Sequence, residues 1–153
     1  MDKKNLLASA KQLMQVAPET ANEYHLKAEQ LTTAMNSAIT KRPDIQNLVG
    51  EHNIEMMKDN HSNHVRFISS ILKNYNPEVM VDTILWVFRA YRSHGFTTNY
   101  WAAQLNTWHT VIKDVLSAKC YAEVYPYYEW MQVNIPIFVK VSDEKLEVPN
   151  SLH

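Results

Sequence analysis

His61 and His64 are the first residues in the sequence whose type and spacing could do chemistry. On a helix they would share one face, because residues three apart are neighbours on the helix surface. A metal site needs a third and usually a fourth ligand. No Asp or Glu stands three residues before any histidine, and no HExxH motif occurs. The pattern therefore favours a solvated or helix-capping role for this pair over a metal site.

Three further residues have chemistry to consider. Cys120 is the only cysteine; a nucleophile is conceivable because its base can come from anywhere in the fold, but a buried apolar role is more usual. His94 precedes Gly95, where a cation would meet the negative end of a helix dipole, which is a structural role. Asp82 stands in an apolar segment. It is expected to face water or to pair with a cation such as Arg89.

The composition limits the function classes. A chain of 153 residues fits one domain with a sizeable core. Fifteen basic and sixteen acidic residues give a net charge of −1, which provides no electrostatic footprint for nucleic acid or an anionic membrane. Two glycines are too few for a phosphate-binding loop.

Targeting signals are not recognisable in the sequence. The apolar patch near the N-terminus is shorter than a secretory signal needs, and the longest apolar run is too short to span a bilayer. A single cysteine excludes an intramolecular disulfide and fits a reducing compartment. The sequence therefore predicts a soluble, cytoplasmic protein with no membrane span.

One predicted helix has clear start and stop signals. Asn76 can cap its first turn, Pro77 fits the first helical position, and Gly95 can end it in a left-handed turn. The residues between Pro77 and Gly95 are mostly apolar, so this helix is expected to be mostly buried.

Apolar periodicity predicts the other helices. They are expected over residues 5–17, 19–39, 45–49, 51–75, 98–116 and 119–141. The polar insert 58–64 predicts either a loop or a polar face within its helix. Pro126 and Pro136 are expected to kink or break the last helix. The run VNIPIFVKV could form a strand, although helix is favoured.

The predicted architecture is all-α, a single domain of about six to eight helices over residues 1–141, followed by a polar tail over 142–153. Twelve of the sixteen aromatic residues, including all four tryptophans, lie between Trp86 and Trp130. This density predicts a large apolar interior. Stacking of nucleobases on these rings would require a basic groove, which is missing. Core packing, a helix–helix interface or a ligand pocket remains.

The order of features from residue 51 onward resembles the second half of a globin. The stretch VFRAYRSHGFTTNYWAAQLNTWHTVIKDVLS resembles the proximal helix and first long helix of globins, and YAEVYPYYEWMQVNIPIFVKVSDE resembles the last helix. In this alignment Tyr91 takes the place of the proximal histidine, and the distal position falls within Asn60–His64. The resemblance is closest to haem-less globin-like sensor domains, in particular the small Bacillus sporulation-inhibitory proteins, which look like detached sensor domains of a sporulation histidine kinase.

That resemblance implies a non-enzymatic sensor. In the family, an apolar tunnel replaces the haem pocket and holds a fatty acid, a small polar chamber can hold a halide ion, and homodimers modulate histidine-kinase signalling. His64, Tyr91 and Arg92 become candidate anchors for the ligand's carboxylate. The full set of residues that the resemblance assigns to the ligand site is His64, Val65, Phe67, Ile68, Leu72, Leu85, Phe88, Tyr91, Arg92, Trp108 and Ile112.

Two alternatives stay open. A haem-binding globin-type sensor could use His94, Tyr91 or His64 as an iron ligand, because tyrosine ligates haem in some proteins. A helical enzyme could use Cys120 or the His61/His64 pair.

Overall fold

The computed structural model describes residues 3–147, and these form nine helices and no strand. The all-α, single-domain prediction is confirmed, with nine helices in place of six to eight. In chain order the helices are α1 (Lys3–Ala10), α2 (Pro18–Leu26), α3 (Ala28–Thr40), α4 (Ile45–Val49), α5 (Ile54–Lys73), α6 (Pro77–Arg92), α7 (Thr98–Val115), α8 (Ala118–Val133) and α9 (Ile135–Glu147).

The additional helices arise where a single residue interrupts a predicted helix. Lys27, with φ −96° and ψ 10°, separates α2 from α3 within the segment predicted as one helix over 19–39. Asn134, with φ −99° and ψ 4°, separates α8 from α9. In both places the apolar stripe resumes immediately after the break, so periodicity alone did not reveal the change in direction.

The prolines of the last segment act differently from each other. Pro126 lies inside α8, which continues through it, so of the predicted kink or break the break does not occur there. Pro136 stands in the first turn of α9, where the missing amide donor costs no helical hydrogen bond. The segment VNIPIFVKV is helical on both sides of Asn134, and α9 runs to Glu147, past the predicted start of the polar tail. The rest of that tail, 148–153, lies outside the described residues.

The start and stop signals of α6 are confirmed. The Asn76 side chain accepts hydrogen bonds from the amides of Glu78 (3.0 Å) and Val79 (3.2 Å), and Pro77 is the first helical residue. Gly95 has a φ of 99°, which a side chain would strain. The expectation that α6 is mostly buried is wrong, because Trp86 is 59% exposed and Val79 46% exposed.

The polar insert 58–64 is helical, so its interpretation as a loop is wrong. Helix α5 runs without interruption from Ile54 to Lys73. Two of the polar residues, Asn60 and His61, are buried, so the insert forms a polar face that is turned into the protein.

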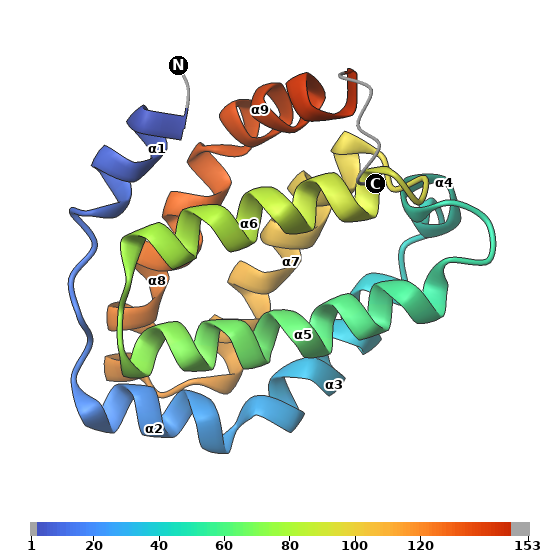
Figure 1. The fold of residues 1–153 in the computed structure, drawn as a ribbon. Helices are drawn as coiled ribbons and strands as arrows, with labels where there is room; N and C mark the ends of the chain where they lie inside the picture. Colours follow the sequence, from blue (N-terminus) through green and yellow to red (C-terminus); the bar gives the residue numbers. More distant parts are fainter. Residues whose placement is uncertain (1–2, 148–153) are drawn as a thin grey trace.

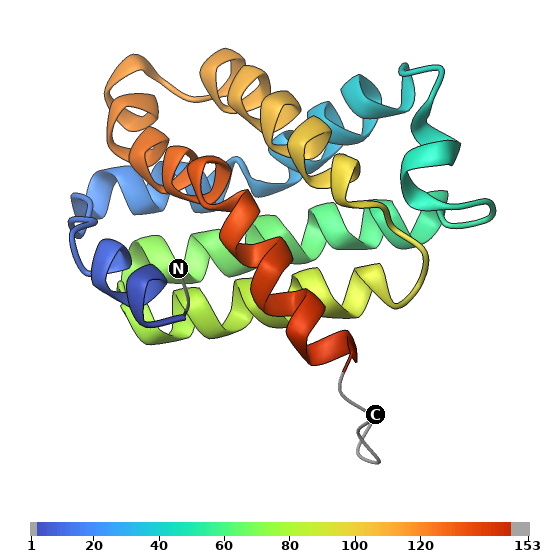
Figure 2. The ribbon, with the colours of Figure 1, turned by 90° about the horizontal axis from the view of Figure 1, so that it is seen from above.

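The helices surround a common interior, in which the two long helices α5 and α6 have different neighbours (Figures 1 and 2). Helix α5 packs closely against α2 and α3, and α7 packs closely against α3 and α8. Helix α6 runs antiparallel to α5 but packs closely against α1 and α9, not against α5. In Figure 2, α9 crosses α6 at a steep angle. The backbones of α5 and α6 thus stay apart over much of their length.

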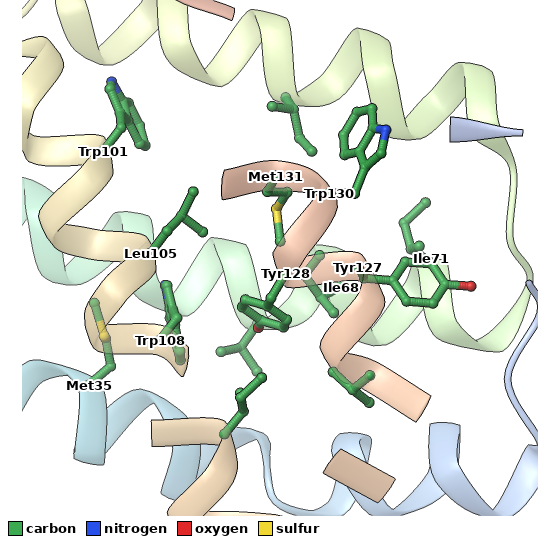
Figure 3. Packing of buried hydrophobic residues seen from close by; sticks show 14 of the residues in the cluster. Met35, Ile68, Ile71, Trp101, Leu105, Trp108, Tyr127, Tyr128, Trp130 and Met131 are labelled. Atoms are coloured by element: carbon green, nitrogen blue, oxygen red, sulfur yellow. The ribbon is translucent and has the colours of Figure 1, made fainter. Parts of the chain in front are cut away.

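Eight of the twelve aromatic residues between Trp86 and Trp130 are buried, which bears out the prediction of a large apolar interior. Figure 3 shows Trp101, Leu105 and Trp108 along α7, with Trp108 beside Tyr128 of α8. Over residues 3–147, no helix has the length and apolar character needed to cross a bilayer.

Candidate ligand-binding cavity

A cavity of about 280 Å³ lies where α5 and α6 are held apart. Helix α7 closes its back, and Met131 of α8 and Phe138 of α9 complete the wall. Figure 3 shows Leu105 and Met131 beside one another below α6. The lining residues are Asn60, Asn63, His64, Phe67, Thr83, Ile84, Trp86, Val87, Phe88, Tyr91, Trp101, Gln104, Leu105, Met131 and Phe138.

The size of this cavity argues for a guest. It is about twice the volume of the ~150 Å³ engineered cavity that takes up benzene. Packed cores leave few voids larger than a water molecule, so the cavity is not ordinary core.

Stacked aromatic rings form the inner wall. The rings of Phe88 and Trp101 are stacked with centroids 4.3 Å apart and planes 21° apart, and Phe138 lies 5.1 Å from Phe88. Tyr91 contacts Trp101 edge to face at 6.3 Å. These contacts join α6, α7 and α9 directly to one another. The inner wall is therefore held by its own ring contacts and needs no side chain from α5 on the other side of the cavity.

The mouth opens between α5 and α6. Trp86 and Asn63, one from each helix, line the cavity and are exposed at the surface. Arg66 is exposed and donates a hydrogen bond to Oδ1 of Asn63. An apolar molecule would therefore enter past a tryptophan ring, with a guanidinium at the rim.

A polar corner lies at the inner end of the cavity, formed by Asn60, His64 and Gln104. Oδ1 of Asn60 accepts hydrogen bonds from Nε2 of Gln104 (3.0 Å) and from the Tyr100 hydroxyl (3.0 Å). Within residues 3–147, no hydrogen bond reaches Nδ2 of Asn60, Oε1 of Gln104 or Nδ1 of His64. Among the described residues, the buried side-chain atoms without a hydrogen-bond partner are Nε1 of Trp101, Nε1 of Trp108 and Nε2 of His109. The three atoms of the corner are not among them, so they keep some accessible surface and can bond a guest molecule.

His61 lies behind this corner and not in the cavity. Its Nδ1 donates to Oδ1 of Asn36 (2.6 Å), and its Nε2 lies 3.2 Å from the Tyr100 hydroxyl. Burial lowers the pKa of His61 to about 3, so the ring is neutral at pH 7. A neutral ring that donates through Nδ1 can only accept at Nε2, so the Tyr100 hydroxyl lies between two acceptors, this nitrogen and Oδ1 of Asn60.

His64 is half-buried and lines the cavity. Its ring stacks on Trp108 at 4.7 Å, and its Nε2 lies 2.9 Å from the Tyr128 hydroxyl, which in turn lies 2.6 Å from the Tyr24 hydroxyl. Burial, followed by the neighbouring His61, lowers the pKa of His64 to about 3. The prediction of a solvated or capping role for the two histidines is wrong, because both belong to interior hydrogen-bond chains. Over residues 3–147, no three His, Cys, Asp or Glu side chains are grouped to hold a metal.

Four of the eleven residues predicted for the site line the cavity: His64, Phe67, Phe88 and Tyr91. Arg92 does not, because it is held by α9: its guanidinium donates to Oγ of Ser142 (2.8 Å) and pairs with Asp143 (2.5 Å). The other six are buried core residues outside the cavity lining, namely Val65, Ile68, Leu72, Leu85, Trp108 and Ile112.

Two polar residues on otherwise apolar helix faces could have indicated the polar corner from the sequence, but the prediction did not use them. Gln104 interrupts the apolar stripe of Trp101, Leu105 and Trp108, and Asn60 follows Met57 on the apolar stripe of α5. A polar residue on a buried face requires a partner. Phe138 could not be recognised in the same way, because its position depends on the turn at Asn134.

The remaining candidates for chemistry have structural environments. Cys120 is buried, its Sγ lies 3.6 Å from the carbonyl oxygen of Thr20, and burial raises the pKa of its thiol to about 12. His94 is exposed, and its carbonyl oxygen accepts a hydrogen bond from Asn53. Asp82 pairs at the surface with Lys3 (2.7 Å) and not with Arg89.

Comparison of the chain with protein-family models, with curated proteins and with solved structures found no match.

Proposed function

We propose that this protein is a non-enzymatic sensor or regulator that binds a fatty acid in the cavity between α5, α6 and α7. The observation that carries the proposal is the combination of an apolar cavity of about 280 Å³ with an inner polar corner that has unused hydrogen-bonding atoms. Ligand sites are mostly apolar and contain a few convergent polar groups, and this cavity has both features.

The energetics suit an alkyl chain. Each buried methylene contributes roughly 0.8 kcal/mol, so ten methylenes would contribute about 8 kcal/mol before the entropy losses of association, which are ~4 kcal/mol or more. Aromatic walls such as Phe88 and Trp101 need no special chemistry to hold such a chain. The remaining requirement is a place for the head group, which the corner at Asn60 and Gln104 offers.

The resemblance to haem-less globin-like sensors supplies the biological part of the proposal, namely homodimers that modulate histidine-kinase signalling in sporulation. Two placements favour it: Tyr91, which takes the place of the proximal histidine, lines the cavity, and so does His64 of the distal segment. One feature departs from it, because the segment compared with the last globin helix divides at Asn134.

Haem fits these residues poorly. His64, Tyr91 and Met131 are the lining residues able to ligate iron, but Nε2 of His64 is bonded to Tyr128 and its ring is stacked on Trp108. Arg92, which could have neutralised a propionate, is bound to Asp143. We therefore prefer an apolar ligand to haem, and a Soret band after incubation with haem would reverse that preference.

An enzyme using Cys120 is also less well supported. A thiol with a pKa of about 12 is almost entirely protonated at pH 7, and the thiolate is the nucleophile. His61 and His64 both have neutral rings whose Nε2 atoms are occupied by tyrosine hydroxyls.

Native mass spectrometry of the protein as purified, followed by extraction of the bound material, tests the proposal. We expect one acyl species per chain in the wild-type protein. Leu105→Phe places a larger side chain in the cavity and should abolish the bound species, while Ile68→Val, which changes a buried residue outside the cavity lining, should retain it. Absence of any bound acyl species, together with no affinity for added fatty acid, would refute the proposal.

A further inference from the structure

The cavity lining contains no charged side chain. None of the fifteen lining residues is Lys, Arg, Asp or Glu, and the groups in it that can titrate are His64 and Tyr91. Two cations lie nearby but outside: Arg66 at the rim, bonded to Asn63, and Arg92, paired with Asp143.

Other titratable groups face His64 from each neighbouring helix, and none of them offers a charge. His61 of α5 is neutral because burial lowers its pKa to about 3. Tyr128 of α8 bonds Nε2 of His64, and Tyr24 of α2 bonds Tyr128. Burial raises the pKa of both of these phenols, so they stay protonated. Trp108 of α7 covers one face of the His64 ring.

A carboxylate at the inner end would therefore be a buried, uncompensated charge. Transfer of such an ion into an apolar site is so costly that the group takes up a proton instead. Buried carboxyl groups with pKa values as high as ~8–9 are known.

We propose that the cavity binds amphiphiles with an uncharged head group, and that a fatty acid binds there as the neutral carboxylic acid. This inference rests on the proposed function. The head group of the acid lies against Asn60, His64 and Gln104. A fatty alcohol of the same length binds without a proton, and an amphiphile with a permanent charge is excluded.

The unused atoms of the corner match a carboxylic acid and not a carboxylate. Nδ2 of Asn60 can donate to the acid's carbonyl oxygen, and Oε1 of Gln104 can accept from its hydroxyl. A carboxylate only accepts, so it would leave Oε1 of Gln104 facing a negative oxygen. Nδ1 of His64 can serve as a further partner at the same head group.

The proton balance is simple. One fatty-acid carboxylate in water and one proton from solution give one bound carboxylic acid, and no bond in the protein changes. Since a free carboxyl group has a pKa of ~4–5, nearly all of the free ligand is ionised above pH 6. The apparent affinity should then fall about tenfold for each unit of pH increase.

Binding of decanoic acid, 1-decanol and decanesulfonate to the full chain, measured by titration calorimetry between pH 6 and pH 8, tests this inference. We expect the affinity for decanoic acid to fall about a hundredfold over that range, the affinity for 1-decanol to stay constant, and decanesulfonate not to bind. Calorimetry in buffers of different ionisation enthalpy should show uptake of one proton per decanoic acid.

Two other results would overturn it in distinguishable ways. If decanoic acid binds with constant affinity and decanesulfonate binds as well, the head group lies at the mouth beside Arg66; the neutral-guest inference fails and the proposed function stands. If none of the three compounds binds at any pH, both fail.

Gln104→Met tests the position of the head group, with Gln132→Met as the matched control. Gln132 is on α8, outside the cavity lining, and bonds Asn106. We expect Gln104→Met to weaken decanoic acid and 1-decanol about 2–10-fold, the loss of one hydrogen bond, while binding of decane is unchanged. Equal effects of the two variants would place the head group elsewhere.

Discussion

The two sides of α5 differ in how the protein fills the space beside them. On the side of α2 and α3 the helices are in close contact, and Val65 and Leu72 are fully enclosed. On the side of α6 the helices stand apart, and His64 and Phe67 border a cavity. A single helix of 20 residues thus takes part in both a packed core and a hollow one.

The difference shows what separates a core from a site. On the closed side, the deeper polar groups have partners: His61 bonds both Asn36 and Tyr100. On the open side, Asn60 and Gln104 line the cavity, bond each other and still have unused hydrogen-bonding atoms. Apolar character alone does not distinguish a binding site from a core. Two further features do so here: the neighbouring helices hold α5 and α6 apart, and polar atoms that line the space between these two helices have no hydrogen-bond partner among the described residues.

The largest expected effect compares a truncation in the packed interior with one beside the cavity. Ile68→Ala should lower the free energy of unfolding by about 2–5 kcal/mol, because it creates a void in packed surroundings. Phe67→Ala should cost less than half as much, since Phe67 is half-buried beside an existing cavity. Urea unfolding measures both. Equal costs would mean that Ile68 and Phe67 are packed alike.

The pH dependence of the free energy of unfolding should show the protonation of the two interior histidines, His61 and His64. Their folded pKa values of about 3 lie below the unfolded value of ~6.5, so the unfolded chain binds more protons between those limits. Stability is then full above pH ~6.5 and is lost as the pH falls toward 3. Between pH 7.5 and 5.5 we expect a loss of roughly 2–3 kcal/mol for the pair. A flat profile over this range would show that His61 and His64 are open to water.

Removing each histidine separately sharpens the comparison. His61→Leu should cost about 1–3 kcal/mol, because Asn36 loses its hydrogen bond from Nδ1 and the Tyr100 hydroxyl loses one of its two acceptors. His64→Leu should cost less, because the Tyr128 hydroxyl keeps its bond to Tyr24. The remaining pH dependence in each variant should be about half that of the wild type. A larger cost for His64→Leu would reverse the assignment of the closed and open sides.

The smallest expected effect lies outside both regions. Glu23 accepts hydrogen bonds from the amide and hydroxyl of Ser117, each at 2.7 Å, which join α2 to the start of α8, and these bonds lower its pKa to about 2. Glu23→Gln should cost about 1 kcal/mol. Since the folded pKa is depressed, this contribution is present above pH ~4.5 and lost as the pH falls toward 2, which is below the range of pH 5.5–7.5 used for the histidines. Glu23 lies outside the cavity lining, so a change in ligand affinity in Glu23→Gln would contradict the independence of this contact from the cavity.

The sequence predicted the helices better than the spaces between them. Asn76, Pro77 and Gly95 identified α6 because their effects are local. The break at Asn134 and the separation of α5 from α6 depend on packing between distant segments, and no local pattern reports them. For the same reason Tyr91 and His64 were placed at the cavity by resemblance, whereas Gln104 and Phe138 were missed.

Titration calorimetry of 1-decanol with the wild-type protein, Leu105→Phe and Ile68→Phe tests most directly whether the space beside α6 is a binding site. The wild-type protein should bind one molecule per chain. Leu105→Phe should stay as stable as the wild type and lose at least tenfold in affinity, because the ring occupies the cavity, whereas Ile68→Phe should lose about 1–3 kcal/mol of stability from overpacking and keep its affinity. No binding to the wild-type protein, or unchanged binding to Leu105→Phe, would contradict the account.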